Sequence, residues 1–243
     1  TTAHTLSLHD ALPILKALIQ LLERAKITPR DTVIFLGDYV DGWSDSANVV
    51  SYLIELAKQN SCIFIRGNHD DLTHNWLATG KLREQWLQHG GQSSIDAYRN
   101  FTSAEKSQHI EFYNQMLNYY IDKENRLFVH AGFTNLHGPE AEYHDTGFYW
   151  DRTLWEMALS LDPDLSPGDQ YYPKRLQLFE EIFIGHTPTT RIGKTHPVNK
   201  ANVWNIDTGA AFTGPISAIE VKTKEIWQSD PVHRLYPNED GRN

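Results

Sequence analysis

Hydrophobic and polar positions along the chain follow two periods, and together they predict a mixed α/β fold. Residues 14–26 and 48–58 place apolar side chains three and four positions apart, which is the spacing of an amphipathic helix, and Pro13 is suited to begin the first one. Runs of β-branched and aromatic residues predict strands at 32–36 and 61–66. Strand, helix and strand in this order indicate a parallel crossover unit.

The rest of the chain is less regular. Residues 71–125 are weakly periodic and rich in Gln, Asn, Trp and His, and they predict a helical insertion over one end of the sheet. Residues 135–175 are rich in Pro, Gly, Asp and Tyr and predict a long irregular excursion. Further strands are expected at 126–130, 181–184, 202–206, 216–221 and 225–227, the last two as a hairpin. No internal repeat is present, so we expect one domain over residues 1–243.

Composition excludes several classes of protein. Of the 243 residues, 40% are hydrophobic and 22% are charged, which is typical of a globular domain. The formal net charge of −9 argues against a nucleic-acid partner, and no apolar run is long enough to predict a membrane span. The single cysteine, Cys62, excludes an intrachain disulfide, so a reducing, cytoplasmic location is expected.

Four short polar runs each follow a predicted strand. They are Gly37-Asp38-Tyr39-Val40-Asp41, Gly67-Asn68-His69-Asp70, Val129-His130-Ala131-Gly132 and Gly185-His186-Thr187-Pro188. Divalent transition metals at hydrolytic sites prefer oxygen and imidazole ligands. The candidate metal ligands in these runs are therefore Asp38, Asn68, His130 and His186.

A candidate acid lies beside these ligands. His69 follows Asn68 directly, so a protonated imidazole there can donate to a leaving oxygen. Such a histidine needs a carboxylate that fixes its tautomer. Asp41 is the candidate partner, and Asp70 is the alternative.

The four runs, in this order over residues 9–227, resemble the calcineurin-like metallophosphoesterases, and most closely the bacterial serine/threonine phosphoprotein phosphatases. The resemblance implies a four-layer α/β/β/α sandwich and a phosphomonoester hydrolase with two divalent metal ions, Mn²⁺ being expected and Fe or Zn being alternatives. It implies that Asp38 bridges the two metals. The expected substrate is a phosphorylated protein, with a dinucleoside polyphosphate or another small phosphoester as the alternative.

The start of the chain departs from the family pattern, which opens with D-x-H-G. Here the aligned residues are Ser7-Leu8-His9-Asp10, so His9 matches a ligand of the first metal while Ser7 replaces a carboxylate. Residues 7–14 also resemble translated sequencing-adapter sequence, and we expect an aberrant or truncated N-terminus at residues 1–14. An incomplete first metal site leaves another class of function open, a non-catalytic phosphate-binding module.

A second departure affects the grip on phosphate. The family continues after the position of Asp41 with an arginine that binds the substrate phosphate, whereas this chain has Gly42-Trp43. Arg152, in the run Trp150-Asp151-Arg152, resembles an arginine that bacterial members place near the phosphate. We therefore predict that Arg152 binds the substrate, because a guanidinium can pair with two phosphate oxygens.

Overall fold

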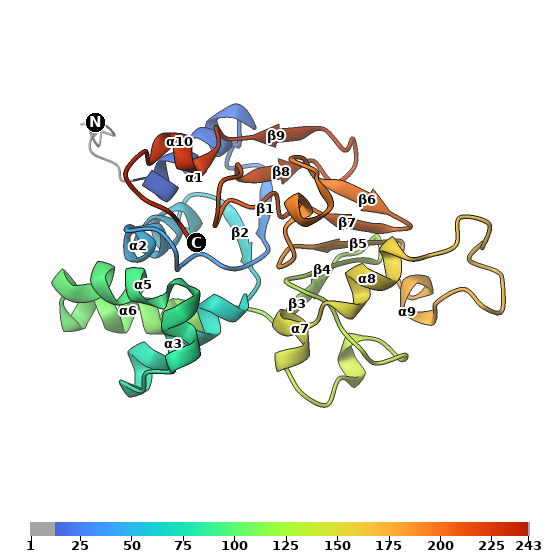
Figure 1. The fold of residues 1–243 in the computed structure, drawn as a ribbon, viewed down its shortest axis with the longest axis horizontal. Helices are drawn as coiled ribbons and strands as arrows, with labels where there is room; N and C mark the ends of the chain where they lie inside the picture. The colour runs from blue at the N-terminus through green and yellow to red at the C-terminus, as the bar shows by residue number, and fades with distance from the viewer. Residues whose placement is uncertain (1–12, 243) are drawn as a thin grey trace.

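The computed structural model describes residues 13–242, and its first half contains the predicted crossover unit (Figure 1). The elements are α1 (Pro13–Arg24), β1 (Thr32–Phe35), α2 (Ser46–Ala57) and β2 (Ser61–Phe64). Strands β1 and β2 are parallel, with Val33 opposite Cys62. The predicted helices and strands of this region are confirmed to within a few residues, including the start of α1 at Pro13.

Helices fill most of the stretch predicted as an insertion. They are α3 (Asn68–Thr79), α4 (Glu84–Trp86), a π-helical turn (Leu87–Gly91), α5 (Gln92–Ala97), a 3₁₀ turn (Tyr98–Asn100) and α6 (Ser103–Asn114). The end of the predicted stretch is wrong, because Tyr119–Ile121 forms strand β3 instead. These residues are aromatic and β-branched, and they pair antiparallel with the following strand.

A five-stranded mixed sheet forms the second half, with the strand order β3-β4-β5-β7-β6. Its remaining strands are β4 (Arg126–Val129), β5 (Glu181–Ile184), β6 (Val198–Lys200) and β7 (Val203–Asn205). Strand β6 was not predicted, because it has only three residues and two of them are polar. The predicted hairpin is confirmed as β8 (Ser217–Ile219) and β9 (Ile226–Gln228), and helix α10 (Val232–Leu235) follows it.

The excursion predicted for residues 135–175 is more ordered than expected. It contains a 3₁₀ turn (Pro139–Ala141), α7 (Thr146–Trp150) and α8 (Thr153–Leu159), and α9 (Lys174–Gln177) begins at its end. Phe148, Leu154 and Trp155 from this segment are buried against β4, β5 and β7. Tertiary packing therefore fixes helices that the composition alone does not predict.

Two apolar cores connect the helices to the strands. One joins α1 and α2 to β1, β2 and α6, and the other joins α7 and α8 to the five-stranded sheet, as their places in Figure 1 also show. The fold class is therefore α/β, as predicted, with strands lying between helical layers. Within residues 13–242, no helix combines the length and apolar character needed to cross a membrane.

Candidate active site

The loops after β1 and β2 are held together by the buried carboxylate of Asp70. Its Oδ2 atom accepts the backbone N–H of Asp38 at 2.7 Å and that of Gly67 at 2.8 Å. Its Oδ1 atom accepts the backbone N–H of Tyr39 at 3.0 Å. The two loops approach so closely that a Cβ on Gly37 would lie 2.5 Å from the nitrogen of Gly67. The ends of β1 and β2 are thus fixed relative to each other, with Asp38 beside the first turn of α3.

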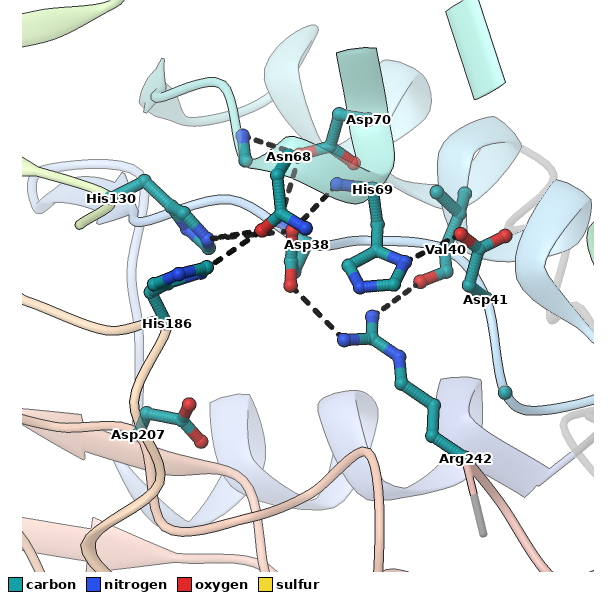
Figure 2. Close-up of polar contacts among 12 residues, drawn as sticks. Asp38, Val40, Asp41, Asn68, His69, Asp70, His130, His186, Asp207 and Arg242 are labelled. Carbon is teal, nitrogen blue, oxygen red and sulfur yellow. Dashed lines mark hydrogen bonds and ion pairs between the residues drawn. The ribbon is translucent and has the colours of Figure 1, made fainter. Parts of the chain in front are cut away.

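Four predicted metal ligands converge at these strand ends (Figure 2). The Oδ1 atom of Asn68 lies 3.2 Å from His130 Nε2 and 3.0 Å from His186 Nδ1. Asp38 Oδ1 lies 3.5 Å from His130 Nε2. The Nδ1 atom of His130 donates to the carbonyl of Leu36 at 2.6 Å, so Nε2 is left with its lone pair facing the other ligands.

This donor set suits a divalent cation. Within residues 13–242, His, Cys, Asp and Glu side chains alone form no group of three or more arranged to hold a metal. Around Asp38, His130 and His186, the amide oxygen of Asn68 is a further oxygen donor. His186 Nε2 is buried without a hydrogen-bond partner. Burial, together with the nearby His130, lowers the pKa of His186 to about 3, which keeps the ring neutral at pH 7.

The charge on Asp38 is also favourable for a metal. Burial alone would raise the pKa of this carboxyl, but the neighbouring His130, His69 and Arg242 lower it well below its usual range. Asp38 and His186 both adopt left-handed backbone conformations, with φ of 61° and 65°. Such conformations are uncommon outside glycine and tend to gather at functional sites.

His69 and Asp41 form the predicted pair. The Nδ1 atom of His69 lies 2.6 Å from Asp41 Oδ2, and both side chains are buried. Because a carboxylate can only accept, Nδ1 carries the proton and Nε2 is the ring nitrogen left for other chemistry. The alternative partner, Asp70, instead accepts the backbone N–H groups described above.

Two contacts to Asp41 were missed by the sequence reasoning. The indole N–H of Trp86 donates to Asp41 Oδ2 at 2.6 Å, and the hydroxyl of Ser94 donates to Asp41 Oδ1. Both residues belong to the helical insertion. No motif or spacing marks them in the sequence. The insertion therefore fixes the carboxylate that contacts His69.

The candidate metal ligands and several arginines line one cavity. Its volume is about 1490 Å³, and it extends to residues of β1 and β8. Arg152 lies on the His186 side, with Nη1 3.5 Å from the Thr187 hydroxyl. Burial and the neighbouring Arg191 lower the pKa of Arg152. The sequence did not predict Arg242, whose Nη1 lies 3.1 Å from Asp38 Oδ2 (Figure 2).

Asp207 and the predicted residues near the start of the chain complete the comparison with the sequence. Asp207 lies in the cavity and accepts the backbone N–H of Gly209, and burial raises the pKa of its carboxyl. The predicted ligand His9, with Ser7 and Asp10, lies outside the described residues. The structure therefore brings together every predicted site residue within its described part.

Comparison with known proteins then decides the family. The model of the calcineurin-like phosphoesterases matches residues 8–211. The chain belongs to the calcineurin-like phosphoesterase family. It is therefore a hydrolase, as the resemblance implied, and members of this family generally use two divalent metal ions.

Curated relatives of this phosphoesterase are named asymmetrical bis(5'-nucleosyl)-tetraphosphatase PrpE. The protein from Oceanobacillus iheyensis is 26% identical over 200 residues, covering 80% of this chain and 75% of the relative. The protein from Anoxybacillus flavithermus is also 26% identical and covers 79% of this chain and 76% of the relative.

Solved structures confirm the fold. A crystal structure described as a candidate diadenosine tetraphosphatase has a TM-score of 0.58 and 17% identity, covering 87% of this chain and 86% of its own. A serine/threonine phosphatase from Saccharomyces cerevisiae, described as similar to human PP5, has a TM-score of 0.58 and 15% identity, covering 96% and 81%. At these identities the likeness concerns the fold alone.

The Trp86 contact generates a prediction for this phosphoesterase. Trp86→Phe removes the indole N–H from Asp41, so His69 should be oriented less well and kcat should fall about tenfold or more, as for other lost partners of site residues. The KM should change little, because the Trp86 side chain is buried and its indole N–H is directed to Asp41. Trp76→Phe is the matched control, since Trp76 packs against Trp86 without a bond to Asp41. Equal kcat in the two variants, measured with p-nitrophenyl phosphate and Mn²⁺, would contradict the positioning role.

Proposed function

We propose that this protein is a metal-dependent hydrolase of dinucleoside polyphosphates. The observation that carries phosphoester hydrolysis is the convergence of Asp38, Asn68, His130 and His186 beside the His69–Asp41 pair. The names of the curated relatives favour a dinucleoside tetraphosphate over the phosphorylated protein that the sequence motifs alone favour.

The four converging side chains would hold a divalent metal, with Mn²⁺ the proposed ion. When bound, such metals stabilise negative charge on a phosphoryl group and lower the pKa of a water molecule. The protein itself supplies orientation and a proton. Asp41 fixes the proton on His69 Nδ1, so a protonated Nε2 can donate to the oxygen that leaves phosphorus. Arg152, beside Thr187, adds positive charge to the same cavity.

An exposed tryptophan at the site supports a nucleotide substrate. Trp150 lines the cavity and is 46% exposed, and its ring lies 6.2 Å from that of His186 at an angle of 81°. Exposed aromatic rings are platforms on which nucleobases stack. Arg152 follows closely in the chain, and the positive charge of Arg191 lowers its pKa. A polyphosphate chain would neutralise the charges of both arginines.

A phosphoprotein phosphatase is the second candidate, since the order and content of the four strand-end runs resemble that branch of the family. A phosphopeptide offers one phosphate and no base, so it would use Asp38 and His69 but gain little from Trp150. A non-catalytic phosphate-binding module is the remaining alternative, and it would bind phosphate without turnover.

A substrate panel separates these candidates. We expect the wild-type protein with Mn²⁺ to hydrolyse diadenosine tetraphosphate with a higher kcat/KM than a phosphoserine peptide. Trp150→Ala should raise the KM for the dinucleotide about fivefold to a hundredfold, because stacking on an aromatic ring is worth about 1–3 kcal/mol per base. The same variant should leave the inhibition constant of inorganic phosphate, which has no ring to stack, almost unchanged. Tyr143→Ala is the control, because Tyr143 is 88% exposed and does not line the cavity.

Faster hydrolysis of the phosphopeptide, with no effect of Trp150→Ala on any substrate, would instead establish the phosphoprotein phosphatase. Binding of phosphate without hydrolysis of any substrate would establish the binding module.

The proposed acid is tested by His69→Ala. Without a proton donor the leaving oxygen departs with its charge, so kcat should fall by about 10²–10⁴. Asp41→Asn should cause a smaller loss, because the imidazole remains but its tautomer is no longer fixed. His137→Ala, in an exposed loop, is the matched control. A His69→Ala enzyme with unchanged kcat and an unchanged pH–rate profile would refute the assignment.

A further inference from the structure

Arg242 reaches the site from the end of the described chain. Its Nη1 atom lies 3.1 Å from Asp38 Oδ2, and its Nη2 atom donates to the carbonyl of Val40 at 2.9 Å. The other oxygen of Asp38 faces His130 and the backbone N–H of His69. Arg242 therefore approaches Asp38 from the side opposite the two histidines of the metal set, as Figure 2 shows.

The segment that carries Arg242 is held in place by contacts outside the site. The backbone N–H of Arg242 donates to the carbonyl of Ala211 at 2.9 Å. Glu239 accepts the backbone N–H and the hydroxyl of Ser44 at 3.0 and 2.7 Å. Between them, Gly241 lies against the ring of Trp43, where an added Cβ would be only 2.9 Å away. These contacts fix the direction from which the Arg242 side chain enters the cavity.

Two glycines make room for the arginine stem. A Cβ on Gly42 would lie 2.6 Å from Arg242 Cγ, and one on Gly90 would lie 3.2 Å from it. Both glycines have left-handed φ values, 92° and 97°, and they are joined by a backbone hydrogen bond of 3.2 Å. The β1 loop and the helical insertion thus form a notch that fits this side chain.

Not all N–H groups of the Arg242 guanidinium have a hydrogen-bond partner. Its side chain is only 11% exposed, yet the Nε atom is buried without a hydrogen-bond partner. An unpaired buried donor is costly, and the natural partner for the remaining N–H groups of a guanidinium is an anion with several oxygens. Arg242 lines the same cavity as His69, Asp38 and Arg152.

We propose that Arg242 is a substrate-binding residue that grips the phosphoryl group from the side of Asp38 opposite His130 and His186. Together with Arg152 it would place positive charge on two sides of the bound phosphate. The proposal deepens the proposed function and rests on it, because it assigns the phosphoryl group of that substrate to this cavity. The carbonyl of Val40 holds the guanidinium through Nη2, and the notch holds the side-chain stem beside the cavity.

Three variants test the proposal. Arg242→Ala removes the side chain, and Arg242→Met keeps an apolar stem in the notch without the guanidinium. Arg234→Ala is the matched control, an exposed arginine of α10 in the same part of the chain. The measurements are the KM for diadenosine tetraphosphate, the inhibition constant of inorganic phosphate, the metal content by mass spectrometry and the melting temperature.

Both Arg242 variants should weaken phosphate binding and raise the KM about ten- to a hundredfold, as expected for lost hydrogen bonds to a charged group. Metal content and melting temperature should match those of Arg234→Ala, and added guanidinium ion should partly restore activity to Arg242→Ala. Higher activity or higher metal content in the Arg242 variants would overturn the proposal, since the arginine would then block the site. An unchanged inhibition constant for phosphate would overturn it as well.

Calorimetry with inorganic phosphate and the Mn²⁺-loaded protein separates this proposal from the proposed function. If the wild type hydrolyses no substrate but binds phosphate, and both Arg242 variants bind it more weakly, the proposed function fails while the role of Arg242 stands. If the Arg242 variants bind phosphate as well as the wild type does, the role of Arg242 fails whatever the activity.

Discussion

The site depends on one buried carboxylate, that of Asp70, which accepts backbone N–H groups from the loops after β1 and β2. Without it, three donors would lose their partner, and a buried donor left unpaired costs about 1–3 kcal/mol. Because Asp70 bonds directly to the backbone of Asp38, it also sets where that side chain points. Asn68 and His69 lie on the same first turn of α3 as Asp70, so these hydrogen bonds position Asp38, Asn68 and His69 relative to one another.

Asp38 then divides the site in two. Its Oδ1 atom faces His130, and its Oδ2 atom faces Arg242. The chain carries a formal net charge of −9, yet arginines gather around this cavity. Local fields at a cleft depend on nearby charges more than on the total, so an acidic protein can still attract a polyphosphate here. Gly42, in place of the arginine that the family resemblance implies, leaves the space that Arg242 fills from the far end of the chain.

The candidate ligands at the strand ends could be predicted because the signal for each lies within a few neighbouring residues. A buried strand followed by glycine and a ligand residue can be recognised within five residues, and Asp38, Asn68, His130 and His186 all lie at such ends. Trp86, Ser94 and Arg242 could not be predicted, because their contacts join residues 45 to 204 positions apart and no periodicity marks them. The same reason applies to the fold: β1, β2 and the closing hairpin show clear patterns, whereas α7 and α8 form through packing on the second sheet.

The proposed chemistry requires a metal-binding set at Asp38, Asn68, His130 and His186. Its most direct test is a crystal structure of the protein grown with Mn²⁺, with the metal located from its anomalous scattering. We expect an anomalous peak in contact with Asp38 Oδ1, the Asn68 amide oxygen and both imidazoles, with Arg242 on the other side of Asp38. A peak elsewhere in the protein, with these four side chains free of metal at saturating Mn²⁺, would contradict it.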